Sequence, residues 1–224
     1  MNNINLDVIF EDNHLIAVNK KSGEIVQGDK TGDEPLSDRV KKYLKVKYKK
    51  PGNVFLGTIH RIDRPTSGVI IFARTSKALT RMNEKFRDNK IYKTYWAILK
   101  NKLPKKHDLL EHYLLKNQKK NKSFISTSEK GKLSILKYNY LKNLKNYFLY
   151  EILPHTGRHH QIRVQLSSIG SPIKGDLKYG AKRSNSNGGI NLHAKKIMFD
   201  HPVTKEKVTI EANCPEEKIW SSIN

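Results

Sequence analysis

Two short segments hold the side chains best suited to chemistry. Residues 60–68 read HRIDRPTSG, and residues 154–163 read PHTGRHHQIR. They contain four of the nine arginines in a chain whose usual cation is lysine: Arg61, Arg64, Arg158 and Arg163. Arginine is a planar, permanently charged donor that holds a carboxylate or a phosphate by two parallel hydrogen bonds. The presence of arginine therefore indicates that both segments bind a carboxylate or a phosphate.

Asp63 stands between two arginines in the first segment. In an extended chain, alternate residues share a face, so we expect Arg61 and Asp63 on one face and His60 and Ile62 on the other. A carboxylate beside a cation stays ionised, which suits a nucleophile, a base or a ligand. The alternative is an ion pair that only closes a turn, and the local sequence by itself favours that alternative.

The second segment leads into a predicted helix. A helix that begins near residue 158 places Arg158 at its amino end, where backbone N–H groups and the helix dipole favour anions. Ile162, Leu166 and Ile169 share one face of that helix. Arg163 does not share this face, so we expect either Ile162 or Arg163 to point away from the core or into a cleft. The alternative is an ordinary amphipathic helix with a hydrated polar side.

Metal, redox and membrane functions are not expected. His159 and His160 are adjacent and project about 100° apart on a helix, which suits no single metal ion. One cysteine, Cys214, excludes an internal disulfide and a cysteine-based zinc site. No apolar run approaches the roughly 20 residues that cross a bilayer, and the N-terminus does not read as a secretory signal. We therefore expect a soluble, cytoplasmic protein.

The charge of the chain points to a polyanionic partner. There are 43 Lys and Arg residues against 21 Asp and Glu, a formal net charge of +22. Nucleic acid is the usual partner of such a protein, although a bias toward lysine and asparagine codons gives a similar composition. The Lys-rich segments 39–50 and 116–122 would track phosphates, or would simply be hydrated surface.

The elements that must position these residues are mostly strands. Strands are expected over 7–10, 14–19, 92–100, 147–154 and 207–212, with more between 107 and 153, and on either side of the polar loop within 54–75. Helices are expected over 36–48, 76–89 with Ser76 as its N-cap, and within 159–170 with Gly170 as its C-cap. We expect a single α+β domain over residues 1–224, with a mixed, largely antiparallel central sheet and a few flanking helices.

Taken together, the motifs resemble those of the RluA-type family of RNA pseudouridine synthases. HRIDRPTSG resembles the family's His-Arg-Leu-Asp-x-x-Thr-Ser-Gly, with Ile62 in place of leucine. KTY resembles its Lys-x-Tyr segment, and TGRHHQIRVQL resembles its Thr-Gly-Arg-x-His-Gln-[Leu/Ile]-Arg-Val-His-Leu. GSPIKGDLKYG and LHAKKIMFDHP resemble the two segments that follow. The resemblance runs from about residue 8 to residue 213.

The resemblance implies an enzyme that isomerises uridine to pseudouridine in structured ribosomal or transfer RNA without a cofactor or a metal. It makes Asp63 the catalytic aspartate, Arg163 the arginine that pairs with it, and Tyr95 the tyrosine against the target base. Asp63 would add to the ring or the sugar, or abstract a sugar proton, and the sequence does not choose between these roles. The target base would be flipped out of the RNA, with Arg61 taking its place. Further RNA-binding residues are expected from the same motifs: His60, Arg158, His160 and Ile162.

Two positions depart from the family pattern. Lys21 stands where the family usually has proline, and Gln165 replaces the usual histidine, with a possible effect on RNA contacts. We expect no separate N-terminal RNA-binding domain, no obligate protein partner and a monomer. The competing functions are a non-catalytic RNA-binding protein on the same scaffold and a metal-dependent nuclease that uses the histidines.

Overall fold

The computed structural model describes residues 6–29 and 31–223, which form two compact units. Unit 1 comprises Met1–Ile91 and Lys195–Asn213, and unit 2 comprises Tyr92–Ala194 and Cys214–Asn224. Each unit is therefore built from two separate stretches of the sequence. The expectation of a single catalytic domain stays a prediction.

Unit 1 consists of antiparallel strands and two helices. Its strands are β1 (Val8–Glu11), β2 (Leu15–Lys20), β3 (Gly57–Thr58), β4 (Ser67–Ala73), most of β10 (Leu192–Asp200) and β11 (Lys207–Glu211). Its helices are α1 (Leu36–Lys47) and α2 (Ser76–Arg87). The pairs β1·β2, β2·β4, β3·β4 and β10·β11 are all antiparallel.

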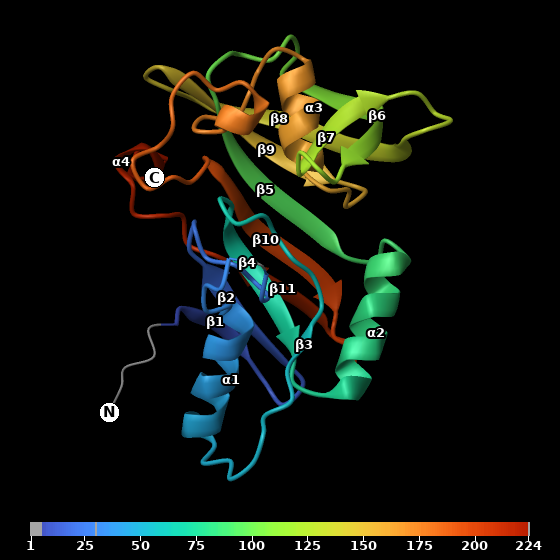
Figure 1. Ribbon diagram of the computed structural model, residues 1–224, viewed down its shortest axis with the longest axis vertical. Coiled ribbons are helices and arrows are strands. Elements are labelled where there is room, and N and C mark those ends of the chain that lie inside the picture. Colours follow the sequence, from blue (N-terminus) through green and yellow to red (C-terminus); the bar gives the residue numbers. More distant parts are fainter. Residues whose placement is uncertain (1–5, 30, 224) are drawn as a thin grey trace. The chain divides into compact units, whose positions relative to one another are not determined.

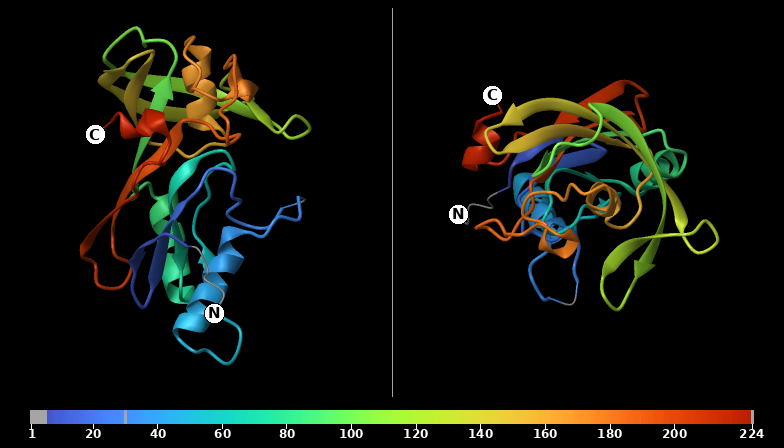
Figure 2. Two further views of the ribbon diagram at one scale, coloured as in Figure 1. Left: turned by 90° about the vertical axis from the view of Figure 1, so that its left-hand side faces the viewer. Right: turned by 90° about the horizontal axis from the view of Figure 1, so that it is seen from above.

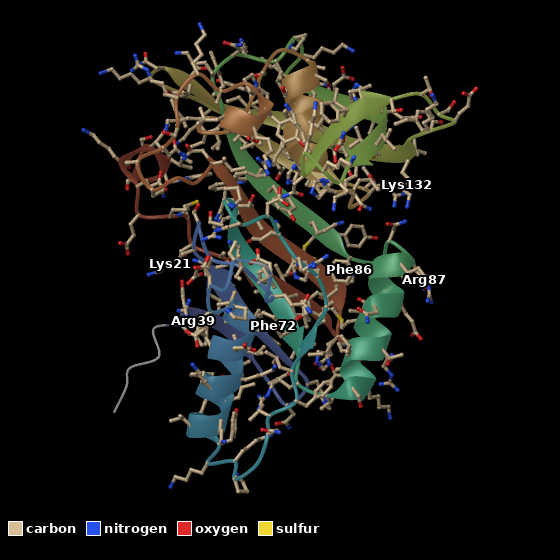
Figure 3. All side chains as sticks on the ribbon, in the orientation of Figure 1. Lys21, Arg39, Phe72, Phe86, Arg87 and Lys132 are labelled. Carbon is tan, nitrogen blue, oxygen red and sulfur yellow. The ribbon has the colours of Figure 1, made fainter. Side chains whose placement is uncertain are left out.

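Helices cover both faces of the β2 and β4 strands (Figure 1). Ile16, Val18, Ile70 and Phe72 pack with Leu36, Val40 and Leu44 of α1, whereas the alternate residues Leu15, Ala17, Val69 and Ile71 pack with Ala78 and Met82 of α2. Burial on both faces explains why these strands read as nearly continuous apolar runs. Figure 3 marks Phe72 on β4 and Phe86 on α2.

The N-cap of α2 is Thr75. Its side chain accepts a hydrogen bond from the backbone N–H of Ala78 at 3.2 Å. The prediction of Ser76 as the cap is therefore wrong by one residue, because Ser76 is the first helical residue. Serine is in general the somewhat better cap, but either hydroxyl accepts this bond, so residue type alone does not identify the cap among the adjacent Thr75 and Ser76.

Unit 2 is a five-stranded antiparallel arrangement with one main helix. Its strands are β5 (Tyr92–Leu99), β6 (His107–Asn117), β7 (Lys122–Ser126), β8 (Lys132–Leu144) and β9 (Tyr147–Pro154), in the spatial order β5-β9-β8-β6-β7. The helices are α3 (Gln161–Ser168), the 3₁₀ turn η1 (Leu177–Tyr179) and α4 (Lys218–Ser221). Ile162 and Leu166 of α3 join a buried cluster with Leu110, Tyr138 and Ile152 of the strands. Figure 2 shows β6 and β7 as a hairpin whose yellow-green tip projects from the strands.

The predicted fold class is confirmed, because the described residues form a largely antiparallel sheet with few helices. Two expectations need correction. The strand before the polar loop is only Gly57–Thr58, and residues 192–200, given no element in the prediction, form β10. Within the residues that the structure describes, no helix is both long enough and apolar enough to cross a membrane.

Candidate active site

In unit 1, Asp63 lies on an irregular loop between β3 and β4. Its side chain is half-buried, and its carbonyl accepts a hydrogen bond from the Thr66 N–H at 3.0 Å, which closes a turn. Arg61 is exposed, and Arg64 forms an ion pair with Asp33 at 2.7 Å. The predicted loop is confirmed, and the charged partner that the structure gives for Arg64 is Asp33, 31 positions away in the sequence.

His60 connects this loop to the body of unit 1. Its Nε2 accepts a hydrogen bond from the backbone N–H of Ile71 on β4 at 3.1 Å. Its ring stacks on Phe86 of α2 with the ring centroids 5.2 Å apart. These contacts fix the start of the Asp63 loop. A role for His60 in RNA binding stays a prediction.

Lys20, at the end of β2, is a buried cation next to the Asp63 loop. Its Nζ donates hydrogen bonds to the carbonyls of Lys21, Glu24 and Arg64 at 2.9, 2.7 and 3.0 Å. Burial lowers the pKa of Lys20 to about 8, while the negative charges of Glu24 and Asp63 act in the opposite direction. Lys20 is not among the residues predicted from the sequence, although a lysine that ends an apolar strand is a usable signal.

The loop after β2 and the Asp63 loop are joined by further hydrogen bonds. Gly23 N–H donates to the carbonyl of Arg64 at 2.8 Å, and the Ser22 hydroxyl donates to that of Pro65 at 2.9 Å. Lys21, where the family usually has proline, donates its backbone N–H to the carboxylate of Glu24 at 2.8 Å. Proline has no N–H, so this bond depends on the departure from the family pattern.

In unit 2, Tyr95 lies on β5 opposite Ile152 of β9. It is half-buried and packs against the cluster that contains Ile152 and Ile162. Lys93 precedes it by two residues and shares its face of the strand. Burial lowers the pKa of Lys93, whose Nζ lies near Gly157. Unit 2 thus brings the Lys-x-Tyr segment and the Thr-Gly-Arg segment close together.

Helix α3 begins later than predicted. Its first residue is Gln161, and His160 before it has a left-handed backbone with φ of 54°. Arg158 therefore precedes the helix and is not its first residue, and its Nε donates to the carbonyl of Leu133 at 3.1 Å. The Gln161 side chain accepts hydrogen bonds from the Arg158 N–H at 2.9 Å and the Thr156 hydroxyl at 2.8 Å. These bonds fix the turn that leads into the helix.

Ile162 and Arg163 are both buried, with 8% and 5% of their surface exposed. Neither side chain points to the surface, so the first alternative is wrong, whereas the second, that one of them points into a cleft, stays a prediction. Arg163 is buried because Asp176 neutralises it: Nε donates to Oδ2 at 2.7 Å and Nη2 donates to Oδ1 at 2.8 Å. Asp176 lies within the GSPIKGDLKYG motif, but its pairing with Arg163 was not predicted, since the two residues are 13 positions apart.

His160 is buried beside Arg163 in a neutral state. Its Nδ1 lies 2.9 Å from the hydroxyl oxygen of Tyr179, and its ring stacks on His159 with the centroids 3.8 Å apart. Burial, with the positive charge of Arg163 next in size, lowers the pKa of His160 to about 2. His159 Nδ1 lies 2.8 Å from the Ser123 hydroxyl on β7. The two histidines thus connect α3 to β7.

Gln165, the second departure from the family pattern, is fully buried. Its Nε2 donates to the carbonyls of Leu110 and Ser134 at 3.2 and 3.1 Å, and lies 3.1 Å from His112 Nδ1. It therefore attaches α3 to β6 and β8. Its side chain is not accessible to RNA within unit 2, so an effect on RNA contacts would be indirect and stays a prediction.

Each unit assembles one part of the predicted site. Unit 1 holds His60, Arg61 and Asp63, and unit 2 holds the remaining predicted residues: Tyr95, Arg158, His160, Ile162 and Arg163. The pairing of Asp63 with Arg163 stays a prediction. Among residues 6–29 and 31–223, no group of three or more His, Cys, Asp or Glu side chains is arranged to hold a metal ion.

Comparisons with known proteins give both relatives and structural neighbours. The chain is 35% identical over 213 residues to Ribosomal large subunit pseudouridine synthase C of Buchnera aphidicola subsp. Baizongia pistaciae, covering 92% of this chain and 66% of that protein. The protein of the same name from Vibrio vulnificus is 33% identical, covering 96% and 69%. tRNA pseudouridine synthase C of Haemophilus influenzae is 29% identical, covering 97% and 96%. The chain thus spans just under two thirds of the length of the Buchnera relative.

Solved structures agree on the fold. Human RNA Pseudouridylate Synthase Domain Containing 4 matches with a TM-score of 0.80 at 22% identity, covering 96% of this chain and 91% of that one. Human RNA Pseudouridylate Synthase Domain Containing 1 matches with a TM-score of 0.75 at 23% identity, covering 99% and 89%. The family model described as RNA pseudouridylate synthase matches residues 14–168, which include the Asp63 loop and the start of α3. This chain belongs to the RNA pseudouridylate synthase family.

Proposed function

We propose that this chain isomerises uridine to pseudouridine in RNA and that Asp63 is its essential carboxylate. The observation that carries the proposal is the family match over residues 14–168, which includes the HRIDRPTSG and TGRHHQIR segments. The reaction exchanges the N1–C1′ glycosidic bond of uridine for a C5–C1′ bond. The hydrogen on C5 is lost to solvent and N1 gains one, so atoms and charge balance without a cofactor.

The surroundings of Asp63 in unit 1 support this role. Its loop is fixed by His60 at one end, and by hydrogen bonds from Lys20, Ser22 and Gly23 at the other. Catalytic groups on loops that are fixed in this way need little rearrangement to react. The negative charge of Asp63 also acts on buried Lys20, whose pKa it raises against the larger effect of burial. Such a carboxylate serves as a nucleophile toward the ring or the sugar, or as a base toward a sugar proton.

The remaining site residues have proposed roles at the base and the RNA backbone. Tyr95 stacks against the target uracil, and Arg163 pairs with Asp63. Arg61, which is exposed, takes the position that the flipped base vacates. Arg158 is also exposed and is available to phosphate, whereas His160 and Ile162 are buried within unit 2 and act on RNA only through the residues that they support.

The substrate that we propose is ribosomal or transfer RNA. Relatives with both kinds of name match nearly the whole of this chain. A net charge of +22 is suited to a polyanion of this kind. We infer a cytoplasmic location from these substrates, and a monomer with no obligate protein partner.

The experiment that tests this proposal measures the release of tritium from uracil C5. Transcripts of large-subunit ribosomal RNA and of transfer RNA, tritiated at uracil C5, are incubated with the protein, and release of tritium to water is measured. The wild type should release it from at least one transcript. Asp63→Asn should reduce the rate by at least about 1,000-fold, since an amide does not replace a carboxylate as nucleophile or base. The control Asp200→Asn, an exposed carboxylate on β10, should retain the full rate.

Two outcomes would contradict the proposal. If Asp63→Asn folds and releases tritium at the wild-type rate, Asp63 is not the catalytic carboxylate. If the wild type binds both transcripts but releases no tritium, the chain is an RNA-binding protein without this activity.

A further inference from the structure

The guanidinium of Arg163 is held along one edge by Asp176. The two hydrogen bonds, from Nε and from Nη2, reach the two different oxygens of the carboxylate. The side chains are 5% and 1% exposed, so the ion pair is shielded from water. Two parallel bonds fix both the plane and the direction of a guanidinium, which one bond would leave free to rotate.

The face of the same guanidinium lies over the ring of Tyr179. The Arg163 Cζ is 5.1 Å from the ring centroid, which is within cation–π range. The tyrosine is itself fixed at its hydroxyl, which accepts a hydrogen bond from the Ser123 N–H at 2.8 Å and lies 2.9 Å from His160 Nδ1. The Arg163 guanidinium is therefore held along one edge by the Asp176 carboxylate and over one face by the ring of Tyr179.

The backbone around Asp176 is also fixed. Its N–H donates to the carbonyl of Ile173, and its own carbonyl accepts hydrogen bonds from the N–H groups of Tyr179 and Ala181, each at 3.0 to 3.1 Å. Gly175 before it has φ of +87°, and a Cβ there would come within 2.6 Å of Asn185 Nδ2. The loop thus presents the Asp176 carboxylate in one direction.

Stability alone explains this arrangement poorly. Taking two charges out of water costs about as much as their attraction returns, and apolar residues of similar size often stabilise a core equally well. The buried ion pair of Arg163 and Asp176, with its two hydrogen bonds, is better explained by a need to hold the Arg163 guanidinium in one orientation.

We infer that Asp176 is a positioning residue that orients the Arg163 guanidinium for the reaction. The inference rests on the proposed function, in which Arg163 acts with Asp63. The bonds to Asp176 use Nε and one hydrogen of Nη2, so the geometry directs Nη1 and the other side of Nη2 away from Asp176. Asp176 acts through Arg163, and Tyr179 supports the same orientation.

The test compares Asp176→Asn with the wild type on the tritiated transcript that the wild type modifies. Asparagine keeps the shape of the side chain but removes its charge and one acceptor. Under single-turnover conditions the rate of tritium release should fall by about 100-fold, a loss that a displacement of about 1 Å is able to cause. The Kd for the same transcript should change by less than about 3-fold. Asp176→Glu, which restores the carboxylate, should recover part of the lost rate.

The pH–rate profile distinguishes positioning from a purely structural role. Without Asp176, the Arg163 guanidinium no longer keeps its orientation toward Asp63. The low-pH limb of the profile, on which the rate falls as the pH falls, should therefore move to higher pH. Loss of folded protein lowers the height of the profile and leaves the position of that limb unchanged. The control Asp200→Asn should change neither the height nor the position.

A readout without turnover completes the test. The Nε–H resonance of Arg163, assigned by its loss in Arg163→Lys, should exchange slowly with water in the wild type and rapidly in Asp176→Asn. Unchanged exchange, or wild-type turnover with an unmoved acid limb in Asp176→Asn, would overturn the inference while leaving the proposed function intact. If the wild type releases no tritium, the proposed function fails, whereas the exchange comparison still decides whether Asp176 holds Arg163.

Discussion

At the scale of single residues, each unit holds a buried cation at its part of the candidate site. Lys20 lies against the Asp63 loop in unit 1, and Arg163 lies against Asp176 and Tyr179 in unit 2. The two cations are satisfied differently, because Lys20 donates to three backbone carbonyls and Arg163 to a carboxylate. The charge of Lys20 is therefore buried at a cost in folding free energy, whereas the charge of Arg163 is neutralised by Asp176.

This cost makes Lys20 a source of pH-dependent stability. Its pKa falls from 10.5 in the unfolded chain to about 8 on folding. Between those values the unfolded chain binds more protons than the folded protein, so the free energy of unfolding should rise with pH. Urea unfolding of the wild type and of Lys20→Met from about pH 7 to about pH 10 isolates this group. The difference in unfolding free energy, wild type minus variant, should increase across the range, and a constant difference would contradict this account.

The sequence supplied most of the candidate residues but not their partners. Asp63, Tyr95 and Arg163 could be proposed from motifs, since each motif is a short continuous stretch of the sequence. Their surroundings depend on residues from distant positions, such as Asp176 for Arg163. An arginine in a helix reads as a surface residue until the loop that neutralises it is known, which is why its burial was not predicted.

At the scale of elements, strands with uniform composition could be predicted and irregular ones could not. β2 and β4 are buried on both faces and are apolar along their length. β10 reads LHAKKIMFD, in which charged and apolar residues do not alternate, so its period gives no signal. The start of α3 was misplaced because His160 adopts a left-handed conformation that is uncommon outside glycine and asparagine.

Two glycines flank Asp176 and Tyr179 and offer a matched pair of variants. Gly175 and Gly180 have φ of +87° and +101°, so alanine at either position costs about 1–2 kcal/mol of conformational strain. At Gly175 a Cβ would also come within 2.7 Å of the carbonyl of Gly189, whereas at Gly180 nothing lies within 4 Å. Gly175→Ala should therefore lower the unfolding free energy by more than Gly180→Ala, as measured in urea. Equal losses would show that the space around residue 175 is not restrictive.

At the scale of the whole molecule, the two Lys-rich segments differ in how many of their positive charges are available to bind phosphate. In the segment 39–50, four cations form ion pairs with carboxylates: Arg39 with Glu24, Lys41 with Asp38, Lys42 with Glu34 and Lys47 with Glu11. In the segment 116–122, at the tip of the β6–β7 hairpin, Lys116, Lys119 and Lys120 are exposed. The second segment is therefore the better candidate for phosphate contacts.

Salt dependence distinguishes these lysines from the rest. Replacing Lys116, Lys119 and Lys120 by glutamine should weaken RNA binding, and should reduce the slope of log K against log salt by about 2–3 if each lysine neutralises one phosphate. Replacing three exposed lysines elsewhere in unit 2, Lys106, Lys137 and Lys145, provides a control of equal charge. Filter binding at several salt concentrations gives both slopes. Equal slopes in the two triple variants would show that the hairpin tip is not a preferred contact.

Unit 1 contains residues from two stretches of the chain, and this division governs when it can fold during synthesis. Its buried core joins Leu15 and Ile71 from the first stretch to Ile197, Phe199 and Ile210 from the last. The ribosome makes residues 92–194 between them, which takes roughly 5 to 20 s at typical bacterial rates. Throughout that interval the apolar side chains of β2 and β4 lack their partners from β10 and β11, so the nascent chain is exposed to chaperones and proteases until residues 195–213 emerge.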